Sequence, residues 1–328
     1  MYSSMRVELI TSLCAFFTTW VNGSLPSQVV DMFAVARGVL VPKVEGSGVR
    51  PLGIGEAWYR LFGRHVLSCL GVIDSLLPLQ MGGGARSGVE ITARVCQLAL
   101  DMNTADIPIC IGSLDIKNAF NSLRRSLILN GIKKHCPQLE HIFRLFYGTP
   151  TEVRLSDGSL ACFSSSGVRQ GDPLSNLLFS VGFMDALEDI RDSLASHVRS
   201  KGLDGYGHVI AYADDVNFSC PTICIEAFGA DVKTILANYD IPLAVEKCSL
   251  YGHGLDSAPF PIQPRGLRRV VGVPVGPIEY RREVLREQLL QMANSLPTVV
   301  RLPTQLAYIL TVQCINARAC YVARIVET

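Results

Sequence analysis

Hydrophobic and polar positions along this chain follow two periods, one typical of strands and one typical of helices. Short apolar or alternating runs predict strands, and apolar residues that recur every three to four positions predict amphipathic helices. Strands, bends or extended pieces are predicted at residues 39–43, 107–116, 152–155, 160–163, 208–211, 216–220, 243–250 and 270–276. Helices are predicted on both sides of a loop at residues 22–26, and at residues 54–80, 89–102, 118–131, 138–147, 173–194, 225–239, 279–296 and 303–324. This mixture predicts an α+β fold.

Two adjacent carboxylates stand between two of these strand patterns. Asp214 and Asp215 separate the apolar run at residues 208–211 from the alternating run at residues 216–220, which predicts a tight hairpin with both acids at its exposed tip. Neighbouring anions repel each other, and a bound divalent cation offsets that repulsion. Oxygen ligands of this kind select Mg²⁺ or Mn²⁺, and a pair of such ions can clamp a phosphoryl displacement. The alternative is an ordinary Asp-rich turn.

A third acid, Asp115, ends the strand predicted at residues 107–116, directly before a predicted helix. A carboxylate at this point stands on rigid backbone and faces a cleft, which suits a metal ligand. A helix cap is the alternative for an acid in this position.

Three loops carry groups that suit a nucleotide or a nucleic acid strand. The loop Arg169-Gln170-Gly171-Asp172-Pro173 opens a long helix and offers an arginine, an amide side chain and free backbone amides. A loop at residues 46–52 stands beside Lys43 and Arg50, which could bind a polyphosphate or simply be surface cations. The glycine-rich run at residues 80–88 permits close approach of backbone to a template strand.

The composition narrows these alternatives only slightly. The chain has 328 residues, of which 48% are hydrophobic and 18% charged, so one large domain or two to three subdomains are expected. The formal net charge of +1 argues against extensive contacts to a nucleic acid backbone. Local basic clusters could still line a channel: Arg265, Arg268 and Arg269, and Arg281, Arg282 and Arg286.

Eleven cysteines, an odd number, are scattered through apolar stretches. This pattern favours reduced core thiols in an intracellular protein over a disulfide framework. Zinc is the alternative for one subset, Cys220, Cys224, Cys248 and His253. The apolar run at residues 9–21 predicts an amphipathic helix rather than a signal peptide, and no run is long enough to span a bilayer.

Three signals stand in order along the chain: a strand that ends in Asp115, a Gly-Asp-Pro loop before a helix, and a hairpin that carries Asp214 and Asp215. This order fits an α+β palm, and the chain here resembles a reverse transcriptase of the non-LTR retrotransposon type. Residues 114–120, 169–175 and 212–215 resemble the three palm motifs of that family. Residues 41–43, 50–52 and 80–90 resemble its fingers motifs, and Lys247 with residues 271–276 its late palm and primer grip.

The resemblance implies a role for each matched residue. Asp115, Asp214 and Asp215 would be the catalytic residues and would hold two Mg²⁺ ions, with Mn²⁺ as the alternative. Phe120 would lie under the sugar and exclude a 2′-hydroxyl, and Lys247 would lie near the leaving group, where it could act as a general acid. The other nucleotide-binding residues would be Lys43, Arg50 and Gln170, and the template or primer would meet Gln80, Gly82 and Arg169.

The resemblance also implies an architecture and partners. We expect a right-hand polymerase with fingers and palm, an antiparallel palm sheet backed by helices, and a short helical thumb. The expected regions are fingers at residues 1–106, palm at 107–264 with interleaved fingers elements, and the end of the palm, primer grip and partial thumb at 265–328. The expected partners are an RNA template, a DNA primer and dNTPs, without a membrane, together with further domains such as an endonuclease of a longer polyprotein. An intracellular, nuclear location would fit.

Three departures from the family pattern keep other functions open. Asn121, Asn176 and Ala244 stand where many relatives have Asp, Pro and Asn, respectively. None of the three is a metal ligand in the family, although Ala244 weakens the assignment of Lys247. A decayed or co-opted copy that binds RNA or a protein partner is therefore one alternative to an RNA-directed DNA polymerase. An RNA-dependent RNA polymerase, against which Phe120 speaks, is another.

Overall fold

The computed structural model describes residues 2–42, 49–255 and 258–326. Two compact units alternate along the chain. Unit 1 comprises Met1–Ala85, Lys117–Leu187 and Tyr239–Pro242, and unit 2 comprises Arg86–Ile116, Glu188–Asn238 and Leu243–Thr328. The region boundaries expected from the family resemblance do not follow this division and stay predictions.

Unit 1 combines a mixed four-stranded sheet with helices. Its strands, in the spatial order β2-β1-β4-β5, are β1 (Ala36–Pro42), β2 (Val49–Gly55), β4 (Thr151–Arg154) and β5 (Leu160–Ser164), and only the β1–β4 pair is parallel. Its helices are α1 (Tyr2–Val21), α2 (Ser27–Ala34), α3 (Ala57–Leu70), α5 (Ala119–Ser122), α6 (Arg125–His135) and α7 (Glu140–Tyr147). Aromatic rings from α1, α3 and α7 pack together in its core, where Phe146 meets Trp20 and Tyr59 edge to face at centroid distances of 5.3 and 4.6 Å.

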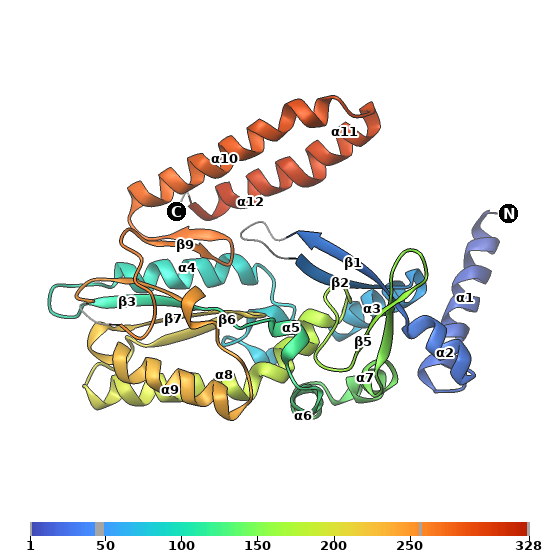
Figure 1. The fold of residues 1–328 in the computed structure, drawn as a ribbon, viewed down its shortest axis with the longest axis horizontal. Helices are drawn as coiled ribbons and strands as arrows, with labels where there is room; N and C mark the ends of the chain where they lie inside the picture. Colours follow the sequence, from blue (N-terminus) through green and yellow to red (C-terminus); the bar gives the residue numbers. More distant parts are fainter. Residues whose placement is uncertain (1, 43–48, 256–257, 327–328) are drawn as a thin grey trace. The chain divides into compact units, whose positions relative to one another are not determined.

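Unit 2 is built on an antiparallel sheet in the order β6-β7-β3-β8. The strands are β3 (Ile109–Leu114), β6 (His208–Tyr212), β7 (Asp215–Pro221) and β8 (Ser249–Gly252). Helix α4 (Gly88–Asp101) covers one face of this sheet and α9 (Ile225–Asn238) the other (Figure 1). Phe218 of β7 meets Phe228 of α9 edge to face at 5.0 Å, which fixes the face on which each β7 side chain lies.

Several elements join or follow these cores. The division between the units falls within α8 (Ser175–Ser200). Beyond the unit 2 sheet lie the hairpin of β9 (Leu267–Val270) and β10 (Val273–Val275) and the helices α10 (Ile278–Val300), α11 (Thr304–Leu310) and α12 (Ala317–Val326), with a π-helix, Thr311–Asn316, before α12. Short 3₁₀ helices occupy Asp74–Leu76, Met81–Gly83, Pro137–Leu139, Thr222–Cys224 and Val245–Lys247.

The elements expected from the hydrophobic pattern are largely present. Strand β2 forms at Val49–Gly55, where the pattern predicts a loop at residues 46–52, and two of the predicted helices differ as well. The helix predicted at residues 54–80 ends at Leu70, because Gly71 adopts a positive φ of 67° that terminates it. The helix predicted at residues 118–131 is broken into α5 and α6, because Leu123 is extended, with φ −61° and ψ 122°. In both cases the helical spacing of apolar residues continues past the point where the helix itself ends. Within the described ranges, every helix is too short or too polar to cross a membrane.

Candidate active site

The β6–β7 hairpin carries the Asp214-Asp215 pair at its tip, as the alternation of apolar and polar residues predicts. Tyr212 pairs with Asp215, so Ala213 and Asp214 form a two-residue turn. Ala213 has a φ of 53° and is 3% exposed. A buried non-glycine residue with positive φ is strained and is held there only by its surroundings. The position of Asp214 is therefore fixed by the packing of its neighbour.

Strand register brings Asp115 beside Asp215. In the antiparallel β3–β7 pair, Leu114 lies opposite Val216. One step further along this register, Asp115 therefore lies opposite Asp215. Residues opposite each other on antiparallel strands project to the same face. Tyr212 shares this face through its pairing with Asp215, and both acids are exposed. Phe218 points to the opposite face, toward α9, so the acids lie on the face that α4 covers.

The backbone of Asp115 is tied to the segment that carries Lys247. The carbonyl of Asp115 accepts a hydrogen bond of 2.8 Å from the Ala244 amide, and the amide of Asp115 donates to Cys248 Sγ at 3.4 Å. Lys247 ends a short 3₁₀ helix that closes back on the Ala244 carbonyl, and its side chain is exposed. Ala244 is thus the backbone link between Asp115 and Lys247, through main-chain groups that any residue would supply.

Cys248, beside Asp115, is a residue whose role the sequence did not indicate. Burial, above all, raises the pKa of its thiol to about 11. At neutral pH the group is therefore a neutral thiol, which adds no third negative charge beside the carboxylates. The sequence marks Cys248 only as a possible zinc ligand, because its neighbour Asp115 is 133 positions away.

The donor set suits a divalent cation in its chemistry. Asp115, Asp214 and Asp215 offer hard carboxylate oxygens from two adjacent strands and the turn between β6 and β7, which Mg²⁺ prefers over other donor types. Among the described residues, however, no three His, Cys, Asp or Glu side chains are gathered closely enough to hold a metal ion. The strand register therefore brings Asp115, Asp214 and Asp215 to the same end of the sheet, but their side chains do not form a closed ligand set.

The zinc alternative finds no support. Cys220 pairs with Cys110 across β7 and β3, with the two sulfurs 3.6 Å apart, whereas Cys248 lies at the other end of the sheet beside Asp115. The four residues Cys220, Cys224, Cys248 and His253 do not converge on one point, and the described part of the chain holds no cluster of metal ligands.

Tyr321 of α12 reaches this face of the unit 2 sheet. Its hydroxyl donates a hydrogen bond of 3.0 Å to the Val271 carbonyl in the β9–β10 turn. Burial and then the charges of Glu90, Tyr212 and Asp215 raise the pKa of the Tyr321 phenol to about 12. The half-buried phenol is therefore within electrostatic range of the Asp215 carboxylate and stays neutral at physiological pH. This contact could not be predicted locally, since the helical pattern at residues 303–324 indicated only a thumb.

Phe120 of unit 1 stands on a rigid support. Its ring stacks on Phe179 of α8 at a centroid distance of 5.0 Å, and its carbonyl accepts a hydrogen bond of 2.7 Å from Val168. Gly167 permits this approach, because a Cβ there would lie 2.1 Å from the Phe120 carbonyl oxygen. The loop that leads to Gln170 and the residue expected under the sugar are thus fixed to each other within unit 1.

The remaining predicted site residues of unit 1 fall into two environments. Arg50 is exposed on β2, whereas Lys43 lies outside the described residues. Gln80 is fully buried and caps a 3₁₀ helix, accepting a 2.8 Å hydrogen bond from the Gly82 amide. Gln170 is half-buried, and the Arg169 side chain is 3% exposed. Gln80 and Arg169 therefore contact the protein itself in this structure.

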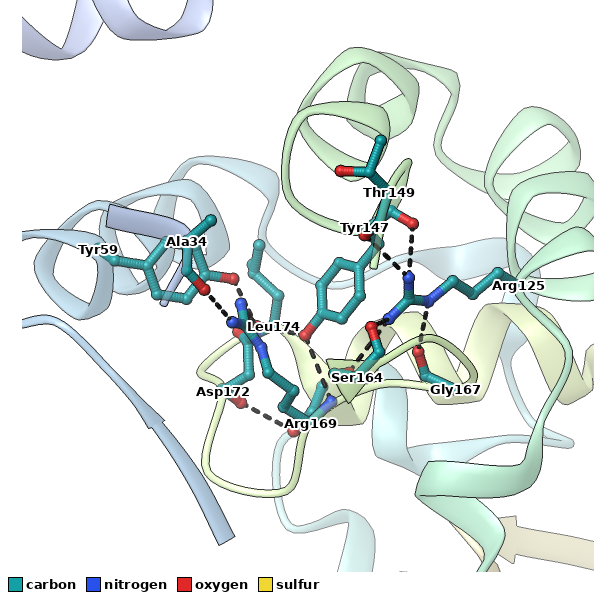
Figure 2. A network of polar contacts seen from close by, with 11 residues as sticks. Ala34, Tyr59, Arg125, Tyr147, Thr149, Ser164, Gly167, Arg169, Asp172 and Leu174 are labelled. Carbon is teal, nitrogen blue, oxygen red and sulfur yellow. Dashed lines mark hydrogen bonds and ion pairs between the residues drawn. The ribbon is translucent and has the colours of Figure 1, made fainter. Parts of the chain in front are cut away.

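Asp172, Tyr59 and Tyr147 form a buried network with Arg169 that the sequence did not reveal (Figure 2). The hydroxyls of both tyrosines donate to the Asp172 carboxylate. The tyrosines lie on separate helices, 113 and 25 positions from Asp172, and in the sequence each is simply one member of an apolar helix face.

Comparison with protein families identifies the class of this chain. The family model described as "Reverse transcriptase (RNA-dependent DNA polymerase)" matches residues 41–267, more than half of the chain. The chain therefore belongs to the reverse transcriptase family, as the three palm motifs predict.

Curated relatives narrow the type to non-LTR retrotransposons. The chain is 24% identical over 240 residues to the Retrovirus-related Pol polyprotein from type-2 retrotransposable element R2DM of Drosophila melanogaster. This alignment covers 70% of this chain and 22% of the relative. The chain is 30% identical over 189 residues to the Pol polyprotein from type-1 retrotransposable element R2 of Nasonia vitripennis, covering 55% of this chain and 18% of the relative. The chain thus spans about a fifth of the length of these polyproteins.

Solved telomerase structures share the fold. The telomerase of Candida tropicalis in complex with a TWJ fragment of telomeric RNA matches with a TM-score of 0.54 at 13% identity, over 90% of this chain and 53% of that chain. The apo telomerase of the same organism, truncated from its C-terminal domain, matches with a TM-score of 0.50 at 14% identity, over 74% and 53% of the two chains. These matches confirm the α+β fingers–palm fold and carry no further argument about this chain.

Proposed function

We propose that this chain is an RNA-directed DNA polymerase core that adds deoxynucleotides from dNTPs to the 3′-hydroxyl of a DNA primer on an RNA template. The observation that carries the proposal is the register of β3 and β7, which puts Asp115 in line with Asp215, directly beside the Asp214 turn. Family membership supports the same reaction.

Asp115, Asp214 and Asp215 would hold two Mg²⁺ ions, with Mn²⁺ as the substitute. When bound, these ions would lower the pKa of the primer hydroxyl and neutralise the departing pyrophosphate. The carboxylates would fix the ions at the ends of the two central strands, since β3 and β7 are paired backbone and packing holds Ala213 in the turn.

Other residues would select and orient the nucleotide. Phe120, stacked on Phe179, would present a rigid ring under the sugar and exclude a 2′-hydroxyl. Arg50 on β2, together with Lys43, would bind the triphosphate, and Gln170 would orient the base or the template. The exposed Lys247, tied by backbone to Asp115, would deliver a proton to the leaving pyrophosphate.

Longer relatives suggest further parts. Because the chain spans about a fifth of the R2-type polyproteins, we propose that it works with other domains, including an endonuclease. All eleven cysteines are free, which supports an intracellular setting, and a nuclear one would fit the need for a DNA target.

Primer extension tests the reaction. Folded protein with an RNA template, a DNA primer, dNTPs and Mg²⁺ is expected to extend the primer, and Asp214→Ala is expected to abolish the product. Asp192→Asn, a change at an exposed acid on α8 that pairs with Arg191, is the matched control and should extend like the parent. Absence of product from folded parent, or unchanged product from Asp214→Ala, would contradict the proposal.

One observation favours a second candidate, a non-catalytic domain that binds RNA or a protein partner. Tyr321 lies near Asp215 on the face where a primer end would have to arrive. Under this alternative the folded chain would bind RNA without extending a primer, and Mg²⁺ would not raise its melting temperature.

A further inference from the structure

Arg169 is enclosed by the protein on every side that the structure describes. Its side chain is 3% exposed, and Nη1 donates a 2.6 Å hydrogen bond to the Ala34 carbonyl at the end of α2. The guanidinium carbon lies 5.5 Å from the ring centroid of Tyr59 and 5.3 Å from that of Tyr147. Among the described residues, Nε and Nη2 make no hydrogen bond, and the two ring faces compensate for part of this loss by cation–π attraction.

Asp172 neutralises this buried cation and joins both tyrosines (Figure 2). Nη2 of Arg169 lies 3.6 Å from Asp172 Oδ2, the atom to which the hydroxyls of Tyr59 and Tyr147 donate. Oδ1 of Asp172 accepts from the Leu174 amide at 2.8 Å, so both carboxylate oxygens are satisfied. Burial, with the charge of Asp172, raises the pKa of both phenols, which keeps them neutral donors. A buried ion pair with this many partners adopts one geometry.

The same tyrosine ring meets a second arginine on unit 1. Arg125 lies 5.2 Å from the Tyr147 centroid and donates to the carbonyls of Tyr147, Ser164 and Gly167 at 2.9, 2.8 and 3.2 Å. Arg125 therefore holds the chain up to residue 167, and Arg169 holds the turn that follows. Arg125 thus holds the loop segment before Gln170, and Arg169 holds the segment that contains Gln170.

Strand β2 rests on the Arg169 side chain. The Gly53 amide donates a 2.8 Å hydrogen bond to the Gln170 carbonyl. A Cβ at Gly53 would lie 3.4–3.5 Å from Cβ, Cγ and Cδ of Arg169, so the arginine stem lies directly beside β2, where glycine leaves room for it. Arg50 is three residues before Gly53 on the same strand. The geometry of Arg169 therefore sets where Gln170 and the Arg50-bearing strand lie relative to each other.

We propose that Arg169 is a positioning residue that holds Gln170 in register with β2, and that it acts on dNTP binding without touching the template or primer. This inference rests on the proposed polymerase function. The family resemblance implies a direct contact of Arg169 with template or primer, and the inference replaces that contact by an indirect role. The reason is that the guanidinium already contacts Ala34, Asp172 and two tyrosine rings inside unit 1.

Arg169→Lys tests the role, since lysine keeps the charge but cannot stack a planar guanidinium between two rings. The KM for dNTP is expected to rise about ten- to a hundredfold, the scale of one lost hydrogen bond to a charged group, while kcat and the Kd for template–primer stay near the parent values. Tyr59→Phe removes one donor to Asp172 with little risk to folding, and should shift the dNTP KM in the same direction by less.

Arg125→Lys is the matched control, because it changes the half-buried arginine that lies against the same Tyr147 ring. It is expected to lower the melting temperature and to leave the dNTP KM within about twofold, a difference of less than 0.5 kcal/mol. Three results would overturn the inference: a raised Kd for template–primer in Arg169→Lys, an unchanged dNTP KM there, or an equal dNTP effect in Arg125→Lys.

Hydrogen exchange separates this inference from the proposed function. The Gly53 amide is expected to exchange faster in Arg169→Lys than in the parent, and at the parent rate in Arg125→Lys. This measurement needs no polymerase activity, so a parent that fails to extend a primer would sink the polymerase proposal while the exchange still tests the positioning. Unchanged Gly53 exchange in Arg169→Lys would refute the positioning itself.

Discussion

Asp115 directly follows Leu114, the cross-strand partner of Val216, and so stands in line with Asp215 on the same face of the unit 2 sheet. Two carboxylates that share one task should not act additively. Asp115→Asn and Asp215→Asn are each expected to lower primer extension by roughly 10²–10³-fold or more, the scale for removing one group that stabilises developing charge. The double variant should be little worse than either single variant.

The control for this cycle is an acid of similar exposure away from the site. Asp204→Asn, which breaks a surface pair with Arg199, should leave the rate unchanged. If the losses from Asp115 and Asp215 multiplied in the double variant, the two residues would be acting in separate steps.

Phe120 is expected to select the sugar. Phe120→Ala should admit ribonucleotides that the parent rejects, because the ring that stacks on Phe179 would no longer occupy the space beside C2′. The measurement is the ratio of kcat/KM for dNTP to that for NTP, expected to fall by about tenfold or more, the worth of one good steric or packing contact. Phe183→Leu changes the next ring, 5.5 Å from Phe179, and should leave the ratio in place. A parent that already accepts NTPs would favour an RNA-dependent RNA polymerase.

Much of the site could be read from local sequence, and what could not depends on long-range packing. Asp115, Asp214 and Asp215 sit at strand ends that the apolar pattern marks, so a strand–turn rule places them. Arg169 shows the limit: the loop predicts a ligand contact, whereas the tyrosines that enclose it come from α3 and α7. A helix period shows which face is buried, but it does not show that a phenol on that face will meet a carboxylate far along the chain.

Helix ends show the same limit. The apolar spacing at residues 118–131 continued across Leu123, whose extended backbone separates α5 from α6. The break lets the Phe120 carbonyl accept from Val168, a contact between segments that no local period encodes.

Buried thiols should weaken the fold at alkaline pH. Burial raises the pKa of Cys96 to about 12 and of Cys136 to about 11, against an ordinary value of 9.0. Above pH 9 the unfolded chain loses these protons while the folded chain keeps them. The contribution of these thiols to the free energy of unfolding is therefore fully present below about pH 9. It falls as the pH rises toward 11, by up to about 1.4 kcal/mol per pH unit for each thiol.

Urea unfolding between pH 7 and pH 10.5 under reducing conditions measures this slope. Cys96→Ala should flatten it, whereas Cys162→Ala, at an exposed thiol on β5, should not. A slope that is the same in Cys96→Ala and the parent would show that other groups cause the alkaline loss.

Tyr321 is expected to limit access to the Asp215 edge. Its half-buried phenol donates a 3.0 Å hydrogen bond to the Val271 carbonyl and is within electrostatic range of Asp215, so we expect a primer end that reaches Asp215 to displace the ring. Tyr321→Ala should therefore lower the KM for template–primer by about two- to tenfold, the scale of one neutral hydrogen bond that no longer has to break. Tyr308→Ala, at an exposed ring on α11, is the matched control and should leave the KM unchanged. A higher KM in Tyr321→Ala would mean instead that the phenol binds the primer.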